Sequence, residues 1–383
     1  MHYKLNTNLF ARMNSGPQFR HVPELDGIRA IAVGLVIASH AGLYGRVPGG
    51  FGVTIFFFLS GYLITSLLRA EYIKTRTVDF RAFYLRRVLR IMPPLYITLL
   101  ILTALYPLRI FGPELNWPAV PWDYLFLSNY SPLWGQAGGL PSPLWSLAIE
   151  EHFYLLFPAA FFLLAGKRTP ARMAATFLLV CVIILLLRCS TVLLFPRLLE
   201  QNYVWTHTRL DSILFGCILA MYQNPLIDEG AWRPKIGHVA AASVLIVSTF
   251  AIRSEVFRQT LRYSMQGVGL FVLFSFVLCA GSERLNRILA SKPFVWIGLL
   301  SYTLYLCHMA IFKTLDRTFH LGPSAAAIAG LPIALLYAQL MRTWVEVPIL
   351  AWRRRHRRTV KAMDALPLTV SDASATPSTH SVQ

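Results

Sequence analysis

The chain alternates between long apolar runs and short polar or basic segments. A helix needs about twenty mostly apolar residues to cross the hydrocarbon core of a bilayer, and each run is close to that length. The pattern predicts an all-α, polytopic integral membrane protein with about ten transmembrane helices in one bundle. The predicted spans are 27–44, 50–68, 93–111, 144–165, 171–188, 206–223, 236–252, 264–281, 294–313 and 323–345.

The same pattern divides the chain into three parts. A polar and basic segment, 1–24, precedes a transmembrane domain, 25–350, and a tail, 351–383, is first basic and then rich in Ser, Thr, Pro and Ala. The tail lacks periodicity and is predicted to be disordered. The first 23 residues hold no apolar core of a signal peptide, so we expect the first span to direct insertion.

The distribution of Lys and Arg predicts the orientation. Cytoplasmic segments of membrane proteins carry an excess of these residues. If the N-terminus is inside, the inner segments hold Lys4, Arg12, Arg20, the 69–90 stretch, Lys167, Arg168, Arg172, Arg233, Lys235, Arg284, Arg287, Lys292 and the 353–361 cluster. The other side keeps mainly Arg46, Arg109, Arg197, Arg253, Arg258, Arg262 and Arg317. Both termini are therefore predicted to be cytoplasmic.

Two segments between the runs are not expected to span the membrane. Residues Asp79 to Ile91 place aromatic and Arg side chains at helical spacing, which predicts an amphipathic interfacial helix that Pro93-Pro94 interrupts before the third span. Residues Gly112 to Pro143 are rich in Pro, Gly, Trp and Asn, as in a substrate-facing loop, although an interfacial aromatic belt has the same composition.

Composition excludes several classes of protein. The 383 residues are 55% hydrophobic and 14% charged, and the net charge of +18 lies between apolar runs rather than on polar elements as in a nucleic-acid binder. The five cysteines show no metal-ligand spacing and are interpreted as small packing residues, so no metal site is predicted. The sequence holds no Walker loop, HExxH or GxSxG motif.

The first candidate pair lies on the first span. Arg29 and His40 are eleven residues apart, close to three turns, so both project from one helix face, about 16 Å apart along the axis. Asp26 is expected to cap this helix. An ionisable pair inside the membrane indicates a functional site. The alternative is that Arg29 reaches the lipid headgroups and His40 is hydrogen-bonded within the bundle.

An arginine cluster follows at the predicted cytoplasmic surface. Arg87 lies three residues and Arg86 four residues before Arg90, so the three guanidinium groups cluster on one side of the helix. Such a cluster suits phosphate, because arginine makes bidentate contacts and is always charged. Attraction to anionic lipid explains the cluster equally well.

Polar positions also line the fourth, sixth and ninth spans. Ser146, Glu150 and Tyr154 form a stripe near the predicted outer end of the fourth span, and Arg209 of the sixth is a possible partner for Glu150. In the ninth span Ser301, Tyr305 and His308 share one face. A structural ion pair for the carboxylate, or a hydrogen-bond network between packed helices, is the alternative to a functional site.

These motifs, in this order, resemble those of the membrane acyltransferase-3 family, which contains bacterial O-antigen, exopolysaccharide, Nod-factor and macrolide acyltransferases. The resembling segments are LDGIRAIAVGLVIASH, GVTIFFFLSGYLI, FYLRRVLRIMPPLY, LWSLAIEEHFYLLFP, HTRLDSILFG, WIGLLSYTLYLCH and the closing Glu346-Val347-Pro348. The most specific part is Arg-x10-His followed by Arg-x-x-Arg. Pro143-Leu144 and His152 depart from the family pattern, so no acceptor role is carried over to that entrance.

The resemblance implies a protein of the bacterial inner membrane. It also implies transfer of an acyl group, expected to be acetyl, from cytoplasmic acyl-CoA to a hydroxyl of a cell-envelope or exported saccharide or glycolipid. Acyl-CoA would be a substrate, with no tightly bound cofactor. The residues that match the family's functional motifs are Arg29, His40, Arg87, Arg90, Ser146 and Glu150, with weaker matches at Arg209 and His308.

From these matches we expect His40 to act as a general base, since histidine titrates near neutral pH. Arg87 and Arg90 would hold CoA phosphates, and Arg29 would bind the donor or orient the site. Glu150 would orient either His40 or an acceptor hydroxyl. The competing class is a secondary transporter or exporter of a saccharide or lipid-linked intermediate, which also uses intramembrane His, Arg and Glu but commonly shows repeats or broken helices.

Overall fold

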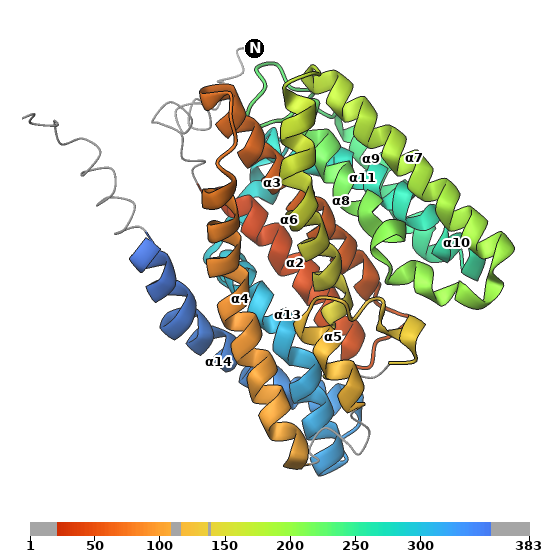
Figure 1. Cartoon of the computed structure of the whole chain (residues 1–383), viewed down its shortest axis with the longest axis vertical. Coiled ribbons are helices and arrows are strands. Elements are labelled where there is room, and N and C mark those ends of the chain that lie inside the picture. Colours follow the sequence, from red (N-terminus) through yellow and green to blue (C-terminus); the bar gives the residue numbers. More distant parts are fainter. Residues whose placement is uncertain (1–20, 109–115, 137–138, 354–383) are drawn as a thin grey trace, which may run out of the picture.

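The computed structural model describes residues 21–108, 116–136 and 139–353. Within these ranges the chain forms a helical bundle without a β-strand (Figure 1). The long helices are α2 (Pro23–His40), α3 (Gly49–Thr75), α4 (Phe80–Leu105), α6 (Leu144–Ala165), α7 (Pro170–Leu194), α8 (Thr206–Met221), α9 (Ile236–Ala251), α11 (Leu261–Leu278), α13 (Lys292–Phe319) and α14 (Pro323–Met341). The short helices are α5 (Val120–Tyr124), α10 (Glu255–Gln259) and α12 (Glu283–Leu289), and a π-helical turn, Arg342–Glu346, continues α14.

Among the described residues, seven helices are long and apolar enough to cross a membrane, namely α3, α4, α6, α7, α11, α13 and α14. The chain is therefore a multi-pass membrane protein. The other three predicted spans also form helices, α2, α8 and α9, which have 18, 16 and 16 residues. Helix α2 carries Glu24, Asp26 and Arg29, and α8 carries Arg209 and Asp211. The count of ten spans and the side of each terminus remain predictions.

Helix α4 corrects the predicted break at Pro93-Pro94, because the interfacial segment and the third span form one continuous helix. Proline in a helix interior removes a backbone donor and leaves a carbonyl without its partner. Membrane helices tolerate this where neighbouring side chains bond to the backbone nearby. Pro93 and Pro94 free the carbonyls of Leu89 and Arg90. The bonds found nearby go to neighbouring carbonyls: Tyr302 donates to that of Ile91 at 3.0 Å, and Thr98 Oγ1 donates to that of Pro94 at 2.7 Å.

Close backbone contacts define the centre of the bundle. A Cβ atom on Gly216 of α8 would lie 1.9 Å from the carbonyl oxygen of Phe58 in α3, and one on Gly61 would lie 2.0 Å from that of Ile213. A Cβ on Gly298 of α13 would similarly lie 2.0 Å from the carbonyl oxygen of Asp26 in α2. Glycine at these positions allows the helix backbones to touch, as is common in membrane bundles. The pairs α3–α8 and α2–α13 therefore form the centre.

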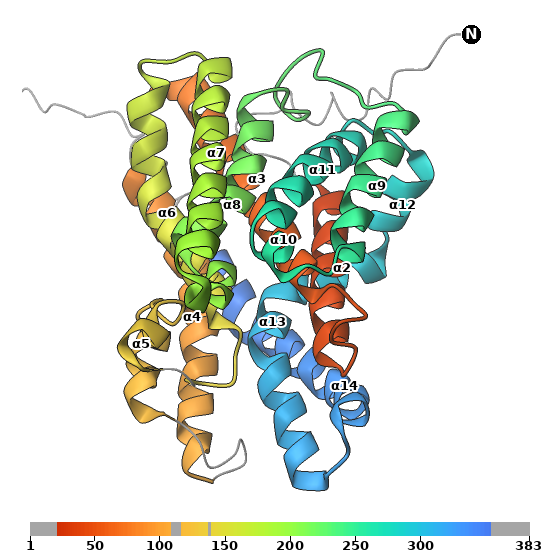
Figure 2. The same cartoon turned by 90° about the vertical axis from the view of Figure 1, so that its right-hand side faces the viewer.

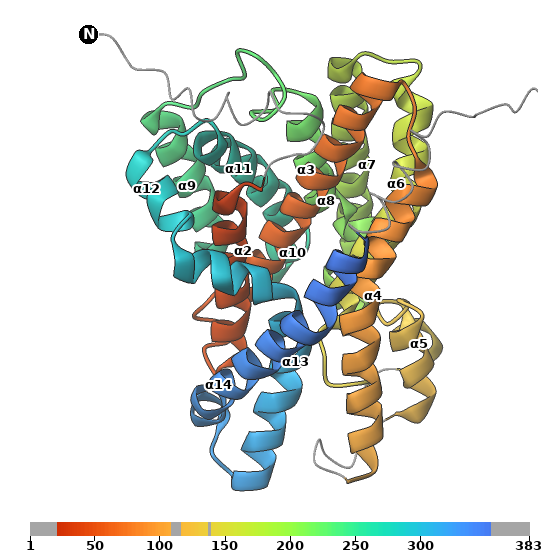
Figure 3. The ribbon, with the colours of Figure 1, turned by 90° about the vertical axis from the view of Figure 1, so that its left-hand side faces the viewer.

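The remaining helices surround this centre. Figure 2 shows α6 and α7 on one side of the bundle and α9, α11 and α12 on the other. In Figure 3, α14 crosses α13 and α4 obliquely, and Thr98 of α4 lies 2.8 Å from the hydroxyl of Tyr337 in α14. Helix α7 leaves most of its apolar side chains exposed, as expected of a helix that faces lipid.

Other sequence predictions have mixed outcomes. Helix α2 begins at Pro23, so Asp26 is not its N-cap and instead bonds to His21 and Arg29. All five cysteines are free, and none is fully exposed. Most of the predicted terminal segments, part of the 112–143 loop and the end of the third span fall on residues 1–20, 109–115, 137–138 and 354–383, outside the described ranges.

Candidate active site

Arginines from two helices gather at one end of the site. Arg29 of α2 lies within electrostatic reach of Arg90, and Arg87 within reach of both. Arg29 Nη1 also donates to Asp26 Oδ1 at 3.1 Å. Two motifs that are separate in the sequence, one on α2 and one on α4, therefore form a single cationic cluster. We call Arg29, Arg87 and Arg90 the arginine cluster.

The third arginine of the predicted motif lies elsewhere. Arg86 forms an ion pair of 3.6 Å with Glu71 at the end of α3. Arg87 is half-buried and lies over the ring of Tyr154 in α6, 5.1 Å from the ring centre, while Arg90 is exposed. Helical spacing predicted the shared face of these side chains, but the partner of each was set by the helices packed against α4.

Helix α6 presents its carboxylates next to the arginine cluster. Ser60 of α3 donates to Glu150 Oε1 at 3.0 Å, and the hydroxyl of Tyr154 lies 3.1 Å from Glu150 Oε2. The predicted stripe from Glu150 to Tyr154 is thus connected. Glu151 lies within electrostatic reach of Arg87, and its buried Oε1 has no hydrogen-bond partner among the described residues. Ser60 and Glu151 were not predicted, although Glu151 directly follows Glu150.

The predicted pair of Glu150 with Arg209 is wrong. Arg209 is fully buried and stacks on Tyr263 of α11 at 3.6 Å, and its Nη2 donates to Thr54 Oγ1 at 3.2 Å. An aromatic ring can stabilise a guanidinium group in place of a carboxylate. Arg209 therefore belongs to the contact between α3, α8 and α11, and Glu150 takes neutral donors.

The other end of the site joins α2, α6 and α13. The hydroxyl groups of Ser146 and Tyr305 lie 2.5 Å apart, and His40 Nδ1 lies 2.8 Å from His308 Nε2. Tyr305 and His308 thus share a face of α13, as predicted. Ser301 donates to the carbonyl oxygen of Gly298 in its own helix. His40 bonds to His308, and no hydrogen bond between His40 and Glu150 is found among the described residues.

The face of α6 connects the two ends. Tyr154, Glu150 and Ser146 succeed one another at four-residue intervals, so they lie along one side of the helix. Tyr154 contacts the arginine cluster, and Ser146 contacts Tyr305, whose ring centre is 6.0 Å from that of His308. We call this row, from the arginine cluster to His40, the polar track.

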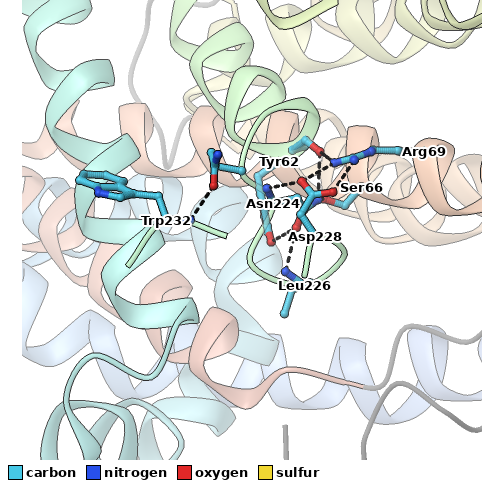
Figure 4. Close-up of polar contacts among 9 residues, drawn as sticks. Tyr62, Ser66, Arg69, Asn224, Leu226, Asp228 and Trp232 are labelled. Atoms are coloured by element: carbon cyan, nitrogen blue, oxygen red, sulfur yellow. Dashed lines mark hydrogen bonds and ion pairs between the residues drawn. The ribbon is translucent and has the colours of Figure 1, made fainter. Parts of the chain in front are cut away.

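A second polar network lies at the junction of α3 with the segment after α8 (Figure 4). Arg69 makes a bidentate pair with Asp228, with distances of 2.9 and 2.5 Å. Tyr62 donates to Asn224 Oδ1 at 2.8 Å, and Asn224 Nδ2 donates to Ser66 Oγ at 2.9 Å. Sequence reasoning did not identify this network, whose members stand far apart in the chain. We call it the anchoring network.

Comparison with known proteins gives relatives that are named as O-acetyltransferases. The chain is 30% identical to O-acetyltransferase OatA of Staphylococcus aureus (strain MRSA252) over 97% of this chain and 63% of the relative. It is also 30% identical to peptidoglycan O-acetyltransferase OatA of Listeria monocytogenes serovar 1/2a (strain ATCC BAA-679 / EGD-e), over 86% of this chain and 56% of the relative. The chain thus spans about three-fifths of the length of these relatives. No solved structure matches it significantly.

The family comparison agrees with the motifs. A model described as an acyltransferase domain matches residues 22–342, which include every member of the polar track. The match covers most of the chain. The chain therefore belongs to the acyltransferase-3 family of membrane acyltransferases.

Proposed function

We propose that this protein is a membrane O-acetyltransferase that moves an acetyl group from cytoplasmic acetyl-CoA to a hydroxyl of a cell-envelope saccharide. The observation that carries the proposal is the polar track, which joins three arginines to a histidine through the buried interior of the bundle. Both relatives named above are O-acetyltransferases, and the Listeria protein is named for peptidoglycan. Peptidoglycan, or a precursor of it, is therefore the first acceptor to test.

The donor would bind with its phosphates at the arginine cluster. Arg87 and Arg90 supply permanent positive charge, and Arg29 joins them from a second helix. The pantetheine arm would follow the face of α6 and place the thioester near His40. The phosphates and the thioester carbonyl are far apart in acyl-CoA, so the two ends of the track would bind the two ends of the donor.

In the reaction itself, neutral His40 accepts the proton of the acceptor hydroxyl as its oxygen attacks the thioester carbonyl. The new ester C–O bond forms and the C–S bond breaks. His40 then returns the proton to the departing CoA thiolate. Glu150 is assigned to the acceptor, since His40 already has His308 as its partner, and Ser146 lines the same side.

A transfer assay tests the base. Membrane vesicles with His40→Gln, radiolabelled acetyl-CoA and peptidoglycan fragments should show kcat lowered by about 10² to 10⁴. Transfer at the wild-type rate would remove His40 from the mechanism. Transfer of label to another glycan, with none to peptidoglycan, would correct the acceptor and keep the reaction.

The donor site is tested separately through KM. Replacing both Arg87 and Arg90 by Ala removes charge-assisted contacts with phosphate and should raise KM for acetyl-CoA at least about tenfold. Arg86→Ala is the matched control, because Arg86 pairs with Glu71 instead of facing the track. An unchanged KM in the double variant would exclude the phosphate role, and acetylation that does not depend on added acetyl-CoA would point to a different donor.

A further inference from the structure

The starting point is His308, a fully buried residue of α13. Its Nδ1 lies 3.0 Å from the carbonyl oxygen of Leu304 and 2.9 Å from that of Tyr305. A carbonyl oxygen only accepts hydrogen bonds. His308 Nδ1 must therefore carry a proton, and this helix turn fixes the tautomer of the ring.

The charge of His308 follows from its surroundings. A buried imidazolium is costly without a carboxylate partner. No Asp or Glu forms an ion pair or hydrogen bond with His308 among the described residues, and Lys313 lies close enough to act electrostatically on the neighbouring His40. His308 is therefore neutral. With a proton on Nδ1, its Nε2 carries a lone pair and can only accept.

The geometry of the two rings assigns the remaining proton. The rings of His40 and His308 are inclined by only 16°, and their centres are 5.1 Å apart. With 2.8 Å between the facing nitrogens, the rings meet edge to edge. The lone pair of an imidazole nitrogen lies in the ring plane, so this is a hydrogen bond from His40 Nδ1–H to His308 Nε2.

The hydrogen bond leaves one nitrogen of His40 available. Its Nδ1 carries the proton, so its Nε2 holds the lone pair of the neutral ring. No hydrogen bond to this Nε2 is found within the described ranges. His40 is the last residue of α2 and is only partly buried, which leaves this edge of the ring free to meet a substrate.

We propose that His308 is a positioning residue that holds His40 in the Nδ1–H tautomer, so that Nε2 is the base that receives the acceptor proton. The proposal rests on the role of His40 given under Proposed function and adds a partner and a specific nitrogen. During attack, the acceptor O–H bond breaks and an Nε2–H bond forms on His40. The Nδ1–H of the resulting imidazolium still donates to His308, and the proton stays on His40 because a second proton on His308 would charge a fully buried ring.

The first test compares two substitutions of His308. His308→Phe keeps a flat ring of similar size but has no acceptor, so His40 loses its orientation and kcat should fall about 10- to 100-fold, with KM for acetyl-CoA unchanged. In His308→Gln an amide oxygen can accept from His40 Nδ1–H, so part of the rate should return. Cys307→Ala, one residue earlier on another face of α13, is the control and should keep the wild-type rate.

The second test measures the tautomer directly. Histidine labelled with ¹⁵N in both ring positions is followed by solid-state NMR in membranes, and the signal of His40 among the ten histidines is identified by its loss in His40→Gln. We expect a protonated Nδ1 and a bare Nε2 in the wild type, and a mixture in His308→Phe. A wild-type His40 protonated on Nε2 would overturn the proposal.

The two proposals fail in different ways. If His40→Gln keeps the wild-type rate, the base assignment is wrong whatever the tautomer. If His40→Gln is inactive but His308→Phe keeps both the wild-type kcat and the wild-type NMR signals, His40 remains the base and only the role of His308 is wrong. If kcat falls equally in His308→Phe and His308→Gln while the tautomer of His40 is unchanged, His308 is a packing residue.

Discussion

The anchoring network and the polar track are both made of polar side chains inside the bundle, but the amide of Asn224 in the first is bonded more completely than the carboxylate of Glu151 beside the second. Asn224 in the anchoring network makes four hydrogen bonds, accepting from Tyr62 and Leu226 and donating to Ser66 and Ala220. Beside the track, Glu151 Oε1 is buried and lacks a partner in the part of the chain that the structure describes.

This difference separates two uses of buried polarity. An amide with four bonds has no capacity left for a ligand, so it holds α3 to the segment after α8. A buried group without a partner costs about 1 to 3 kcal/mol and keeps a bonding position open for a ligand, although Arg69 Nε of the anchoring network also lacks a partner among the described residues. Substitutions in the anchoring network should therefore lower stability, and those in the track should change activity.

The largest effect on stability is expected at Asn224. Asn224→Leu keeps a similar volume but leaves the buried hydroxyl of Tyr62 and the N–H of Leu226 without partners, which should cost about 3 to 5 kcal/mol. Unfolding in detergent against added SDS measures the loss. The specific activity of the molecules that remain folded should be unchanged.

Asn286 supplies the matched control for this change. It is a partly buried asparagine whose side chain makes a single hydrogen bond among the described residues, from Nδ2 to the carbonyl oxygen of Val277 at 2.9 Å. Asn286→Leu should therefore be much less destabilising than Asn224→Leu. Lost specific activity at unchanged stability in Asn224→Leu would place the anchoring network in the mechanism and remove the distinction.

The next effect concerns the close contact between α3 and α8. Gly216→Ala puts a methyl group against the backbone of Phe58 and should cost about 2 to 3 kcal/mol, because neither helix backbone can move aside without disturbing its neighbours. Gly34→Ala in α2 is the control, since a Cβ there meets nothing within 4 Å. Equal melting temperatures for the two variants would contradict the contact.

A carboxyl group in the loop between α4 and α6 should make the free energy of unfolding depend on pH, by an amount on the order of 2 kcal/mol. Burial raises the pKa of Asp123 to about 6, against the opposing hydrogen bond from the Leu140 N–H. Because the pKa is higher in the folded protein than in the unfolded chain, this contribution favours folding below about pH 4 and is lost as pH rises toward 6 and beyond. Melting temperatures from pH 4 to 8 should show this decline, and Asp123→Asn should flatten it.

The Asp123 prediction has a clear failure. The amide of Asn keeps an acceptor for Leu140 but has no charge to bury, so only the pH dependence should disappear. A decline of the same size in Asp123→Asn would assign it to other groups.

Some of the fold and site could be predicted because helical spacing fixes faces. Arg29 and His40 do lie on one helix, and Tyr305 and His308 do share a face of α13. Apolar length also located the helices. Helices α8 and α9 have only 16 residues each, which is short for a span, so their crossing of the membrane stays a prediction. These properties are local, so one sequence is enough to predict them.

The partners between helices could not be predicted, because periodicity does not say which faces meet. His40 and His308 are bonded across 268 positions, and Arg209 met an aromatic ring where a carboxylate was expected. The helix break predicted at Pro93-Pro94 was wrong for a related reason. The groups that bond to the backbone beside these prolines come partly from α13, so α4 continues where an isolated helix would break.

The smallest effect is expected at Glu151. Its carboxylate lies near the arginine cluster, within electrostatic reach of Arg87, so a negative charge there should weaken phosphate binding. Glu151→Gln removes that charge, and we expect KM for acetyl-CoA to fall about threefold at low salt and less at high salt, with stability changed by less than about 1 kcal/mol. Steady-state transfer assays at two salt concentrations measure this at alkaline pH, where the buried carboxyl group is ionised.

The sign of that change is informative because it opposes the change expected for the arginines. Glu255→Gln, in the exposed α10 where Glu255 pairs with Arg258, controls for the loss of one negative charge elsewhere. If Glu151→Gln unfolds the protein, Glu151 stabilises the fold, as the anchoring network does. If KM rises instead, the carboxylate orients Arg87 more than it repels the donor. A fall in KM that salt removes means that Glu151 and the arginine cluster act on one anion.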